Sequence, residues 1–436
     1  MEELISLIKN REAKVGVMGM GYVGLPLALV FSEAGFPVLG FDVDPDKVAR
    51  LNRGDSYIAH IDATRVAAAT APPGRLQATT DFSRLAECDA VLICLPTPLG
   101  RHREPDLTYI RGAAETIAHH LRPGQLVVLE STTYPGTTDE ELRPILEETG
   151  LHTPQDFWLA FSPEREDPGS RRFTTRNIPK VVGGVNPEST EVAAALYGEV
   201  LESVIQVSHS RVAEAAKLLE NIYRAVNIAL VNELKMTFDR MGIDIWEVID
   251  AASTKPFGFQ PFYPGPGLGG HCIPLDPFYL TWKAAEYGVW TRFIELAGEI
   301  NTNMPAWVVA KAAAALSDEG QSLKGARVLV LGLAYKPDID DDRESPSYRL
   351  IELLLERGAE VAYCDPHFPV TRPGRRGRPE LHSVPLTAEE FARYDLLLLA
   401  TAHQEFKNPV LYRNVRLVVD TRNVVKEEWG PRVVKA

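Results

Sequence analysis

The sequence predicts an α/β protein in which two doubly wound parallel sheets flank a central helical domain with a long helix. Short apolar runs alternate with helical patterns at the start of the chain and again near its end. Between them, Arg211 to Met241 has a helical pattern without a proline. We therefore expect three domains, at residues 1–205, 206–316 and 317–436, close to the usual ~150 residues per domain.

Composition narrows the class of protein further. The 436 residues include 46 Lys and Arg against 59 Asp and Glu, a net charge of −13. This balance argues against a nucleic-acid partner, because such binding needs a basic face that displaces counterions. The chain has no apolar run of ~18 residues and opens on an acidic segment, so we expect neither a membrane partner nor a signal peptide. Its four cysteines are widely spaced and show no zinc spacing, which favours a cytoplasmic protein with free thiols and no metal.

The first half opens on a glycine-rich turn between a strand and a helix. We expect strands at residues 14–18, 38–42, 90–95, 126–130 and 157–161, and a first helix at 25–31. Gly19, Gly21 and Gly24 form a GxGxxG pattern between the first strand and that helix. Glycines there permit a tight turn and let the backbone approach a pyrophosphate at the helix N-terminus.

An acidic residue supports a dinucleotide site at this turn. Asp42 ends the second strand, where a carboxylate accepts hydrogen bonds from ribose hydroxyls and repels a 2′-phosphate. The expected cofactor is therefore NAD rather than NADP. Lys47, five residues further on, covers the adenosine or is a solvated helix lysine.

The last third repeats this pattern of elements. We expect strands at residues 327–333, 360–366, 396–401 and 415–420, a helix at 347–357 and a basic surface loop at 371–379. Tyr335, Lys336 and Arg343 follow the glycine turn after the first of these strands. Their cations suit a grip on an anionic ligand.

The middle combines helices with one loop that is rich in proline and glycine. We expect helices at residues 244–252, 277–287 and 292–317, and a loop from Phe257 to Pro277. Packing does not require the many glycines around Cys272, whereas a loop that approaches a ligand and presents a thiol does. Asp276 can orient the thiol, a lysine or a water, and His271 is the alternative base.

The long helix carries a narrow polar stripe. At 100° per residue, Lys217, Asn221 and Arg224 fall on one face. A broad apolar sector lies away from it: Leu218, Leu219, Ile222, Ala225, Val226 and Ala229. The stripe is either a solvated face or part of a site.

Further polar residues follow the expected strands of the first half. Glu164 lies in a loop after the strand at 157–161, and Thr97 and Thr132 follow two other strands. Ligands of α/β proteins bind at the carboxyl ends of strands. Glu164 is thus either a general base for water or part of a solvated acidic loop.

These segments together resemble the UDP-glucose/GDP-mannose dehydrogenase family along essentially the whole chain. The motifs are PGPGLGGHCIPLDP at 264–277, FSPEREDPG at 161–169 and GLAYKPDIDDDRESP at 332–346. They look most like the branch that oxidises UDP-N-acetylhexosamines, with UDP-N-acetylglucosamine (UDP-GlcNAc) as the expected sugar, for bacterial surface polysaccharides. The resemblance implies two Rossmann-like domains, NAD, a UDP-sugar substrate held by the C-terminal domain, and a homodimer formed by the central domain.

The resemblance also implies a role for each matched residue. Cys272 would be the nucleophile, and Lys217 and Asn221 would stabilise the C6 oxygen with support from Asp276. Glu164 would serve the hydrolytic step, in which Thr132 would hold the water. NAD would contact Gly19, Gly21, Tyr22, Val23, Gly24, Asp42, Lys47, Thr97, Thr132 and Arg343. The UDP-sugar would contact Glu164, Arg165, Lys217, Asn221, Arg224, Gly269, Tyr335 and Lys336.

One departure bears on the sugar. UDP-glucose dehydrogenases usually carry lysine where this chain has Leu275, and several relatives carry an arginine in the segment at 253–259. The close alternatives are UDP-glucose and UDP-N-acetylmannosamine (UDP-ManNAc). A more distant alternative is a two-electron β-hydroxyacid dehydrogenase, which would need no cysteine. A non-catalytic NAD-binding protein would make Cys272, Lys217 and Glu164 incidental.

Overall fold

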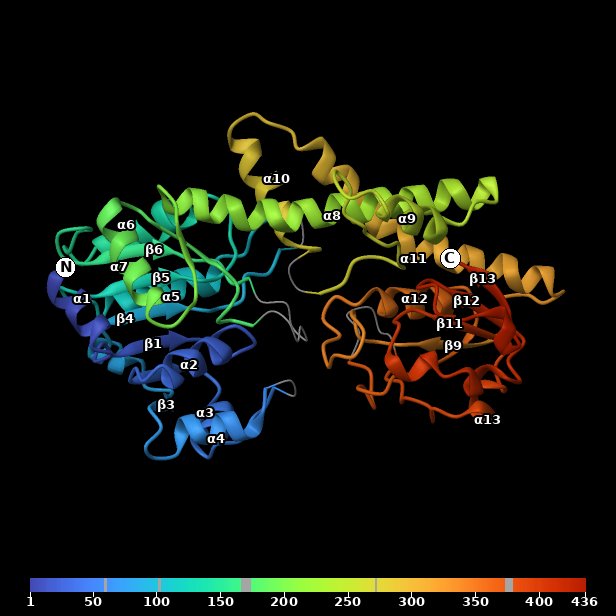
Figure 1. Cartoon of the computed structure of the whole chain (residues 1–436), viewed down its shortest axis with the longest axis horizontal. Helices are drawn as coiled ribbons and strands as arrows, with labels where there is room; N and C mark the ends of the chain where they lie inside the picture. Colours follow the sequence, from blue (N-terminus) through green and yellow to red (C-terminus); the bar gives the residue numbers. More distant parts are fainter. Residues whose placement is uncertain (59–60, 101–102, 166–173, 271–272, 373–378) are drawn as a thin grey trace. The chain divides into compact units, whose positions relative to one another are not determined.

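The structure is a computed structural model that describes residues 1–58, 61–100, 103–165, 174–270, 273–372 and 379–436. Its internal contacts divide the chain into two compact units. Unit 1 comprises residues 1–220 and 278–290, and unit 2 comprises 221–277 and 291–436. Each unit holds one mainly parallel sheet, and long helices run through the middle of the chain, which confirms the predicted fold class (Figure 1).

Unit 1 is built on an eight-stranded sheet. Its strands follow the order β3-β2-β1-β4-β5-β6-β7-β8, parallel except for the antiparallel pair β6 and β7. The five strands expected from the sequence are confirmed, and β3, β7 and β8 are additional. The bounds are β1 Val15–Met18, β2 Val38–Phe41, β3 Leu76–Thr79, β4 Ala90–Ile93, β5 Leu126–Leu129, β6 Trp158–Phe161, β7 Lys180–Gly184 and β8 Val204–Gln206.

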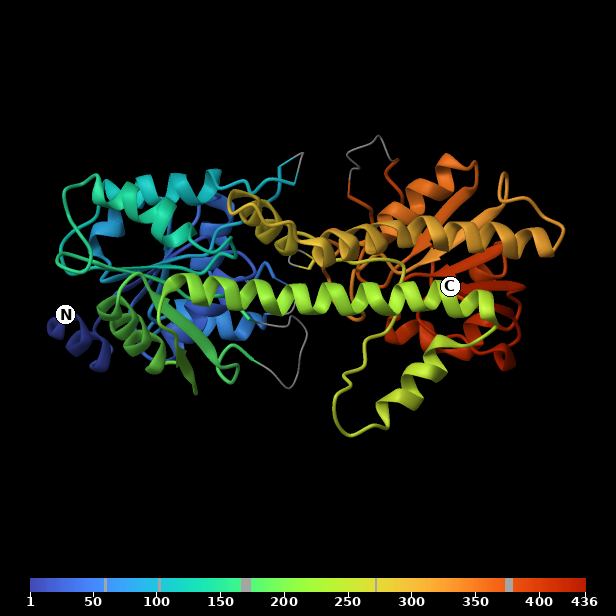
Figure 2. The ribbon, with the colours of Figure 1, turned by 90° about the horizontal axis from the view of Figure 1, so that it is seen from above.

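Helices cover both faces of this sheet because its central strands are apolar on both sides. The helices are α1 Glu2–Lys9, α2 Gly24–Glu33, α3 Pro45–Asn52, α4 Ala63–Thr70, α5 Thr108–Ala118, α6 Arg143–Glu147 and α7 Pro187–Gly198. In Figure 2 the dark blue α1 and green α7 lie on one side of the sheet, and the cyan to teal α5 and α6 lie on the other. Because the helices cover the two faces of the sheet, the carboxyl ends of the strands are followed by loops.

Unit 2 carries a second, five-stranded parallel sheet in the order β10-β9-β11-β12-β13. Its strands are β9 Arg327–Leu331, β10 Glu360–Cys364, β11 Leu396–Leu399, β12 Leu417–Asp420 and β13 Arg432–Lys435. Helices α11 (Arg292–Asp318) and α12 (Pro346–Glu356) pack on one face, and α13 (Ala388–Phe391) packs on the other (Figure 1). The predicted strands and helix are confirmed, and β13 is additional.

The helices of the middle region agree with the sequence pattern. The structure has α8 at Ser210–Met241, α9 at Ile245–Ser253, α10 at Asp276–Glu286 and α11 at Arg292–Asp318. The described residues before α10, 257–270 and 273–275, form a loop, as expected, and α10 itself begins at Asp276. No described helix combines the length and the apolar character needed to cross a membrane.

Candidate active site

The glycine turn lies between β1 and α2, where the sheet order reverses between β1 and β4. Gly19 has a φ of +91°, and a side chain on Gly24 would collide with the carbonyl oxygen of Gly19. These two glycines therefore shape the turn itself. A Cβ on Gly21 would meet nothing within 4 Å, so that position leaves room for a phosphate close to the backbone. The half-buried Tyr22 and Val23 follow it and lead into α2.

Asp42 holds the glycine turn and remains suited to a ribose. The buried carboxylate accepts the Met20 amide at 3.0 Å and the Asp44 amide at 3.0 Å, and lies 3.5 Å from Lys47 Nζ. A carboxylate offers about four lone-pair sites, so it can still accept ribose hydroxyls. With the open position at Gly21, these residues fit an NAD molecule.

We expect the protein to prefer NAD over NADP by at least about tenfold, or ~1.4 kcal/mol. A 2′-phosphate would face the Asp42 carboxylate and would displace the ribose hydrogen bonds. The measurement is kcat/KM with NAD divided by kcat/KM with NADP. Asp42→Asn keeps the size of the side chain but removes its charge, so it should lower this ratio. Equal use of both cofactors by the unaltered protein would refute the role of Asp42.

Two threonines that follow separate strands meet at the same edge of the sheet. Thr97 Oγ1 donates to the carbonyl oxygen of Thr132 at 2.8 Å. Ser131 links the same two segments, because its hydroxyl donates to the Leu95 carbonyl at 2.7 Å and accepts the Leu95 amide at 3.0 Å. The buried Tyr279 of α10 donates its hydroxyl proton to the carbonyl oxygen of Thr97. The segments after β4 and β5 are thus fixed to each other.

Lys217 and Glu164 also come together within unit 1. Lys217, buried on α8, donates from Nζ to the backbone carbonyl oxygen of Glu164. The neighbouring Arg165 pairs with Glu220 at 2.7 Å and donates to the carbonyl oxygen of Pro179 at 2.5 Å. The loop after β6 is therefore tied to α8, which brings an acid, a lysine and a guanidinium into one neighbourhood.

A buried ion pair beside this loop was missed by the sequence analysis. Glu130, at the end of β5, is fully buried and lies 2.5 Å from Lys180 Nζ, at the start of β7. Because β7 runs antiparallel to β6, its first residue lies near the carboxyl end of β6. Burial favours the neutral lysine, but the negative charges of Glu130 and Glu164 outweigh it and raise the pKa of Lys180. The only local signal is an acid and a lysine beside apolar runs.

In unit 2, Asn221 and Asp276 are joined by a hydrogen bond between their side chains. Asn221 Nδ2 donates to Asp276 Oδ2 at 2.6 Å, and both side chains are buried. Since Asn221 is four residues after Lys217 on α8, the two lie on one face of that helix. Arg224, the third member of the predicted stripe, is exposed. The carboxylate of Asp276 fixes the amide of Asn221 in one orientation.

The glycine-rich loop requires one correction. Packing does call for two of its glycines, because side chains at Gly269 and Gly270 would collide with Tyr335 of unit 2. A Cβ on Gly269 would lie 2.5 Å from Tyr335 Cβ, and one on Gly270 would lie 2.9 Å from the Tyr335 ring. Gly265 lies against Arg422, and Gly267 lies against Pro346. The loop thus packs on Tyr335, a predicted substrate contact, whereas Cys272 and His271 lie outside the described residues.

The segment after β9 carries the other predicted contacts of unit 2. Tyr335 and Lys336 are half-buried there. Arg343 Nη2 pairs with the buried Asp341 at 2.6 Å, and the Arg343 carbonyl accepts the Gly270 amide at 3.1 Å. Residues 335–343 and the glycine-rich loop are therefore joined.

The three cysteines that the structure describes are buried and free: Cys88, Cys94 and Cys364. Burial raises the pKa of the Cys88 thiol to about 12 and of the Cys364 thiol to about 12. Burial likewise raises the pKa of Cys94 well above its ordinary value. Thiols of this kind stay protonated at neutral pH and are poor nucleophiles.

Comparisons with known proteins identify the family of the chain. Three family models of the UDP-glucose/GDP-mannose dehydrogenase family match: the NAD binding domain at 13–201, the central domain at 211–303 and the UDP binding domain at 329–427. The chain is 38% identical over 400 residues to a UDP-N-acetyl-D-glucosamine 6-dehydrogenase of Pseudomonas aeruginosa, covering 91% of this chain and 92% of that one.

Two further similarities concern a different sugar. The chain is 33% identical over 421 residues to a UDP-N-acetyl-D-mannosamine dehydrogenase of Pyrococcus horikoshii, covering 95% of this chain and 96% of that one. A solved UDP-D-ManNAc dehydrogenase structure from Pyrococcus horikoshii superposes with a TM-score of 0.87 at 32% identity, covering 97% and 99% of the two chains. The chain therefore belongs to the UDP-glucose/GDP-mannose dehydrogenase family, as an oxidoreductase with NAD as its cofactor and a UDP-sugar as its class of substrate.

Proposed function

We propose that the enzyme oxidises the C6 alcohol of a UDP-N-acetylhexosamine, in first place UDP-GlcNAc, to the uronic acid in a four-electron reaction. The observation that carries this proposal is the pairing of Lys217 with Glu164 and of Asn221 with Asp276. A two-electron alcohol oxidation needs neither a nucleophile nor a residue that activates water. The relatives' names, which divide between two N-acetylated UDP-sugars, support the substrate class.

NAD would be held by the glycine turn and the strand ends of unit 1. Gly19, Gly21, Tyr22, Val23 and Gly24 would contact the pyrophosphate, and Asp42 the ribose. Lys47, Thr97, Thr132 and Arg343 complete the proposed contacts. NAD held there would supply the hydride acceptor, with one NAD consumed in each of the two oxidations.

The thiolate of Cys272 would add to the aldehyde that the first oxidation produces. The resulting thiohemiacetal is oxidised to a thioester, so one difficult oxidation becomes two accessible steps. Lys217 and Asn221 would stabilise the negative charge on the C6 oxygen, because an ammonium and an amide N–H both donate to an oxyanion. Asp276 would keep the Asn221 amide directed toward it.

Water would then release the acid from the thioester. Glu164 would take a proton from this water, which Thr132 would hold. The contact of Lys217 with the Glu164 backbone supports this role, because it fixes the loop that carries the carboxylate.

The UDP-sugar would lie against the glycine-rich loop and the segment after β9. Gly269, Tyr335 and Lys336 would contact it, and the packing of Gly269 on Tyr335 supports their acting together. Arg165 and Arg224 are the remaining proposed contacts. Arg165 already pairs with Glu220, so its guanidinium has a fixed orientation from which its other N–H groups can donate.

We expect kcat/KM for UDP-GlcNAc to exceed that for UDP-glucose by about ten- to a hundredfold. The first reason is Leu275, which stands where UDP-glucose dehydrogenases usually have a lysine. The second is that polar groups of the protein that would pair with the acetamide of UDP-GlcNAc would have no partner when UDP-glucose binds. An unpaired buried polar group costs roughly 1–3 kcal/mol. The measurement is turnover across UDP-GlcNAc, UDP-GalNAc, UDP-ManNAc and UDP-glucose, with NADH counted per acid formed.

The same panel separates the alternatives. Highest turnover with UDP-ManNAc or UDP-glucose would replace UDP-GlcNAc as the substrate while keeping the chemistry. One NADH per sugar, with aldehyde accumulating, would reject the four-electron reaction. Binding of NAD and UDP-sugar without turnover would point to a non-catalytic protein.

The central region is also the proposed dimer interface. Several large apolar side chains of unit 2 are exposed there: Tyr223 (47%), Leu230 (51%), Phe257 (71%), Phe293 (79%) and Leu296 (52%). Leu219 of α8 is exposed as well, so the apolar sector of this helix is not wholly buried. Exposed apolar side chains of this size favour a partner surface. We expect light scattering to report twice the chain mass of 48.2 kDa.

The three proposed domains follow from these roles. Residues 1–205 would bind NAD, 206–316 would form the dimer and 317–436 would bind the UDP-sugar. The free thiols at Cys88, Cys94 and Cys364 are typical of a reducing cytoplasm, where we place the enzyme. Its uronic acid product would serve the synthesis of surface polysaccharide.

A further inference from the structure

In both sheets an aspartate follows the second strand in sequence order, but the two aspartates have different hydrogen-bond partners. In unit 1 this acid is Asp42, and Gly19 begins the turn beside it. In unit 2 it is Asp365, beside Gly332, whose φ is +94°. Asp365 Oδ2 accepts the Leu333 amide at 2.5 Å and the Ala334 amide at 3.2 Å. Asp365 thus anchors the start of the segment at 332–343, here named the nucleotide loop.

His403, from the segment after β11, also contacts Asp365. Its Nε2 lies 3.2 Å from Asp365 Oδ2, and both side chains are buried. Burial opposes ionisation of Asp365, but hydrogen bonds from His403 and from backbone amides outweigh it and lower the pKa of that carboxyl. An ionised carboxylate only accepts, so Nε2 carries the proton and donates it.

The other ring nitrogen of His403 contacts the nucleotide loop directly. His403 Nδ1 accepts the Asp338 amide at 3.0 Å, and Asp338 Oδ1 accepts the Gln404 amide at 2.8 Å. Asp338 has a φ of +61°, which is uncommon for a residue with a side chain and requires surroundings that hold it. These two hydrogen bonds hold it in that conformation.

The nucleotide loop is therefore fixed on both sides of its proposed ligand contacts. Ala334 is held by Asp365 and by Thr401, whose hydroxyl donates to the Ala334 carbonyl at 2.6 Å. Asp338 is held by His403. Tyr335 and Lys336 lie between these two anchors, and His403 contacts the groups that form both.

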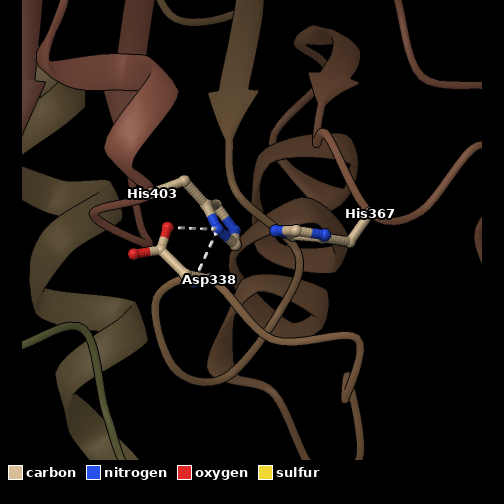
Figure 3. A group of neighbouring side chains, drawn as sticks. All are labelled: Asp338, His367 and His403. Carbon is tan, nitrogen blue, oxygen red and sulfur yellow. Dashed lines mark hydrogen bonds and ion pairs between the residues drawn. The ribbon is translucent and has the colours of Figure 1, made fainter. Parts of the chain in front are cut away.

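The same residues could also be considered as a metal site. Donor atoms of Asp338, His367 and His403 lie within 4.8 Å of one another. Figure 3 shows the ring of His367 pointing toward that of His403, which lies beside the Asp338 carboxylate. Both nitrogens of His403 already have hydrogen-bond partners, so a metal would have to displace one of them. The hydrogen bonds favour a positioning role.

We propose that His403 is a positioning residue for UDP binding, which holds the nucleotide loop through Asp365 on one side and the Asp338 amide on the other. The proposal rests on the proposed function, because Tyr335 and Lys336 are taken as UDP-sugar contacts. In this proposal the two ring nitrogens of His403 have different roles. Nδ1 fixes the loop, and Nε2 sets the tautomer that leaves Nδ1 free to accept.

Two substitutions separate the roles of the two nitrogens. In His403→Asn the amide oxygen takes the place of Nδ1 and can accept the Asp338 amide. In His403→Gln the amide nitrogen reaches the place of Nε2, but the acceptor at Nδ1 is lost. We expect titration calorimetry with UDP to give a Kd raised about three- to tenfold in His403→Gln and within about twofold of the unaltered protein in His403→Asn. NAD affinity should change much less than UDP affinity in both variants, because all proposed NAD contacts except Arg343 lie in unit 1.

Hydrogen–deuterium exchange of residues 335–343 without ligand provides a second measurement. Faster exchange in His403→Gln than in His403→Asn supports the proposal, and equal exchange and equal UDP affinity in both variants overturn it. Binding of Zn²⁺ by the unaltered protein that is lost in His367→Ala also overturns it, because His403 would then be a metal ligand.

The failure of the proposed function gives a different result. An unaltered protein that binds no UDP refutes the substrate contacts, whereas the exchange measurement still decides whether His403 holds the loop. Thermal unfolding of each variant identifies a general loss of stability. Faster exchange confined to residues 335–343 supports a local role for His403, and faster exchange across unit 2 overturns it.

Discussion

Cys272→Ser is expected to reduce formation of the sugar acid by about 10³-fold or more while NAD affinity stays within about twofold. A serine hydroxyl is a far weaker nucleophile than a thiolate, so it adds to the aldehyde less readily and little hemiacetal forms that could be oxidised to an ester. The unaltered enzyme should make two NADH per acid, and the variant at most one per sugar. NADH absorbance together with chromatography of the sugar products measures both quantities.

Cys364→Ala is the matched control for this change. The Cys364 thiol is buried in β10, and burial raises its pKa to about 12, so it should be chemically inert. We expect the control to keep the two-NADH stoichiometry even if its stability falls. Unimpaired acid formation by Cys272→Ser would remove Cys272 from the mechanism.

Glu164→Gln is expected to slow release of the acid about 10²- to 10³-fold and to slow the first oxidation much less. The amide has the size of the carboxylate but cannot take a proton from water. The Lys217 contact should survive, because Lys217 donates to the backbone carbonyl of Glu164 and not to its side chain. A thioester should therefore accumulate on Cys272, and intact-protein mass spectrometry after mixing with NAD and UDP-GlcNAc should detect it.

Glu220→Gln provides the control for a change of charge in the same neighbourhood. Glu220 pairs with Arg165 next to Glu164, so its loss removes one negative charge without removing the proposed base. We expect no adduct in this variant. Absence of an adduct in Glu164→Gln, with the first hydride transfer slowed, would give Glu164 a different role.

Local features of the sequence were sufficient to predict most of the secondary structure. The apolar runs that became β1, β2, β4 and β5 are buried along their whole length, which is why they are recognisable without any partner. The turn at Gly19 and the helix α8 are also local, because they depend on backbone freedom and on a repeat of 3.6 residues. The antiparallel β7 is buried as well, but its apolar run is only two valines long, and its direction depends on its pairing with β6.

The glycine-rich loop shows where local reasoning goes wrong. From the sequence, its glycines were interpreted as room for a ligand. The structure shows that Gly269 and Gly270 are also required by the side chain of Tyr335, which is more than 60 positions away in the chain. The sequence pattern indicated that the backbone of this loop lies close to other atoms, but it did not indicate whether these belong to a ligand or to the protein.

The sequence by itself determined the order of strands and helices, the glycine turn with Asp42, and the residue types that could perform the chemistry. Only the tertiary structure decided which of these groups meet. Glu130 pairs with Lys180, which is 50 positions away in the sequence, and Asp365 contacts His403, which is 38 positions away. The physical reason is that helix and strand formation depends on neighbours within a few residues. The partner of a buried charge is instead set by which strands lie side by side in the sheet, because a buried polar group without a partner is costly.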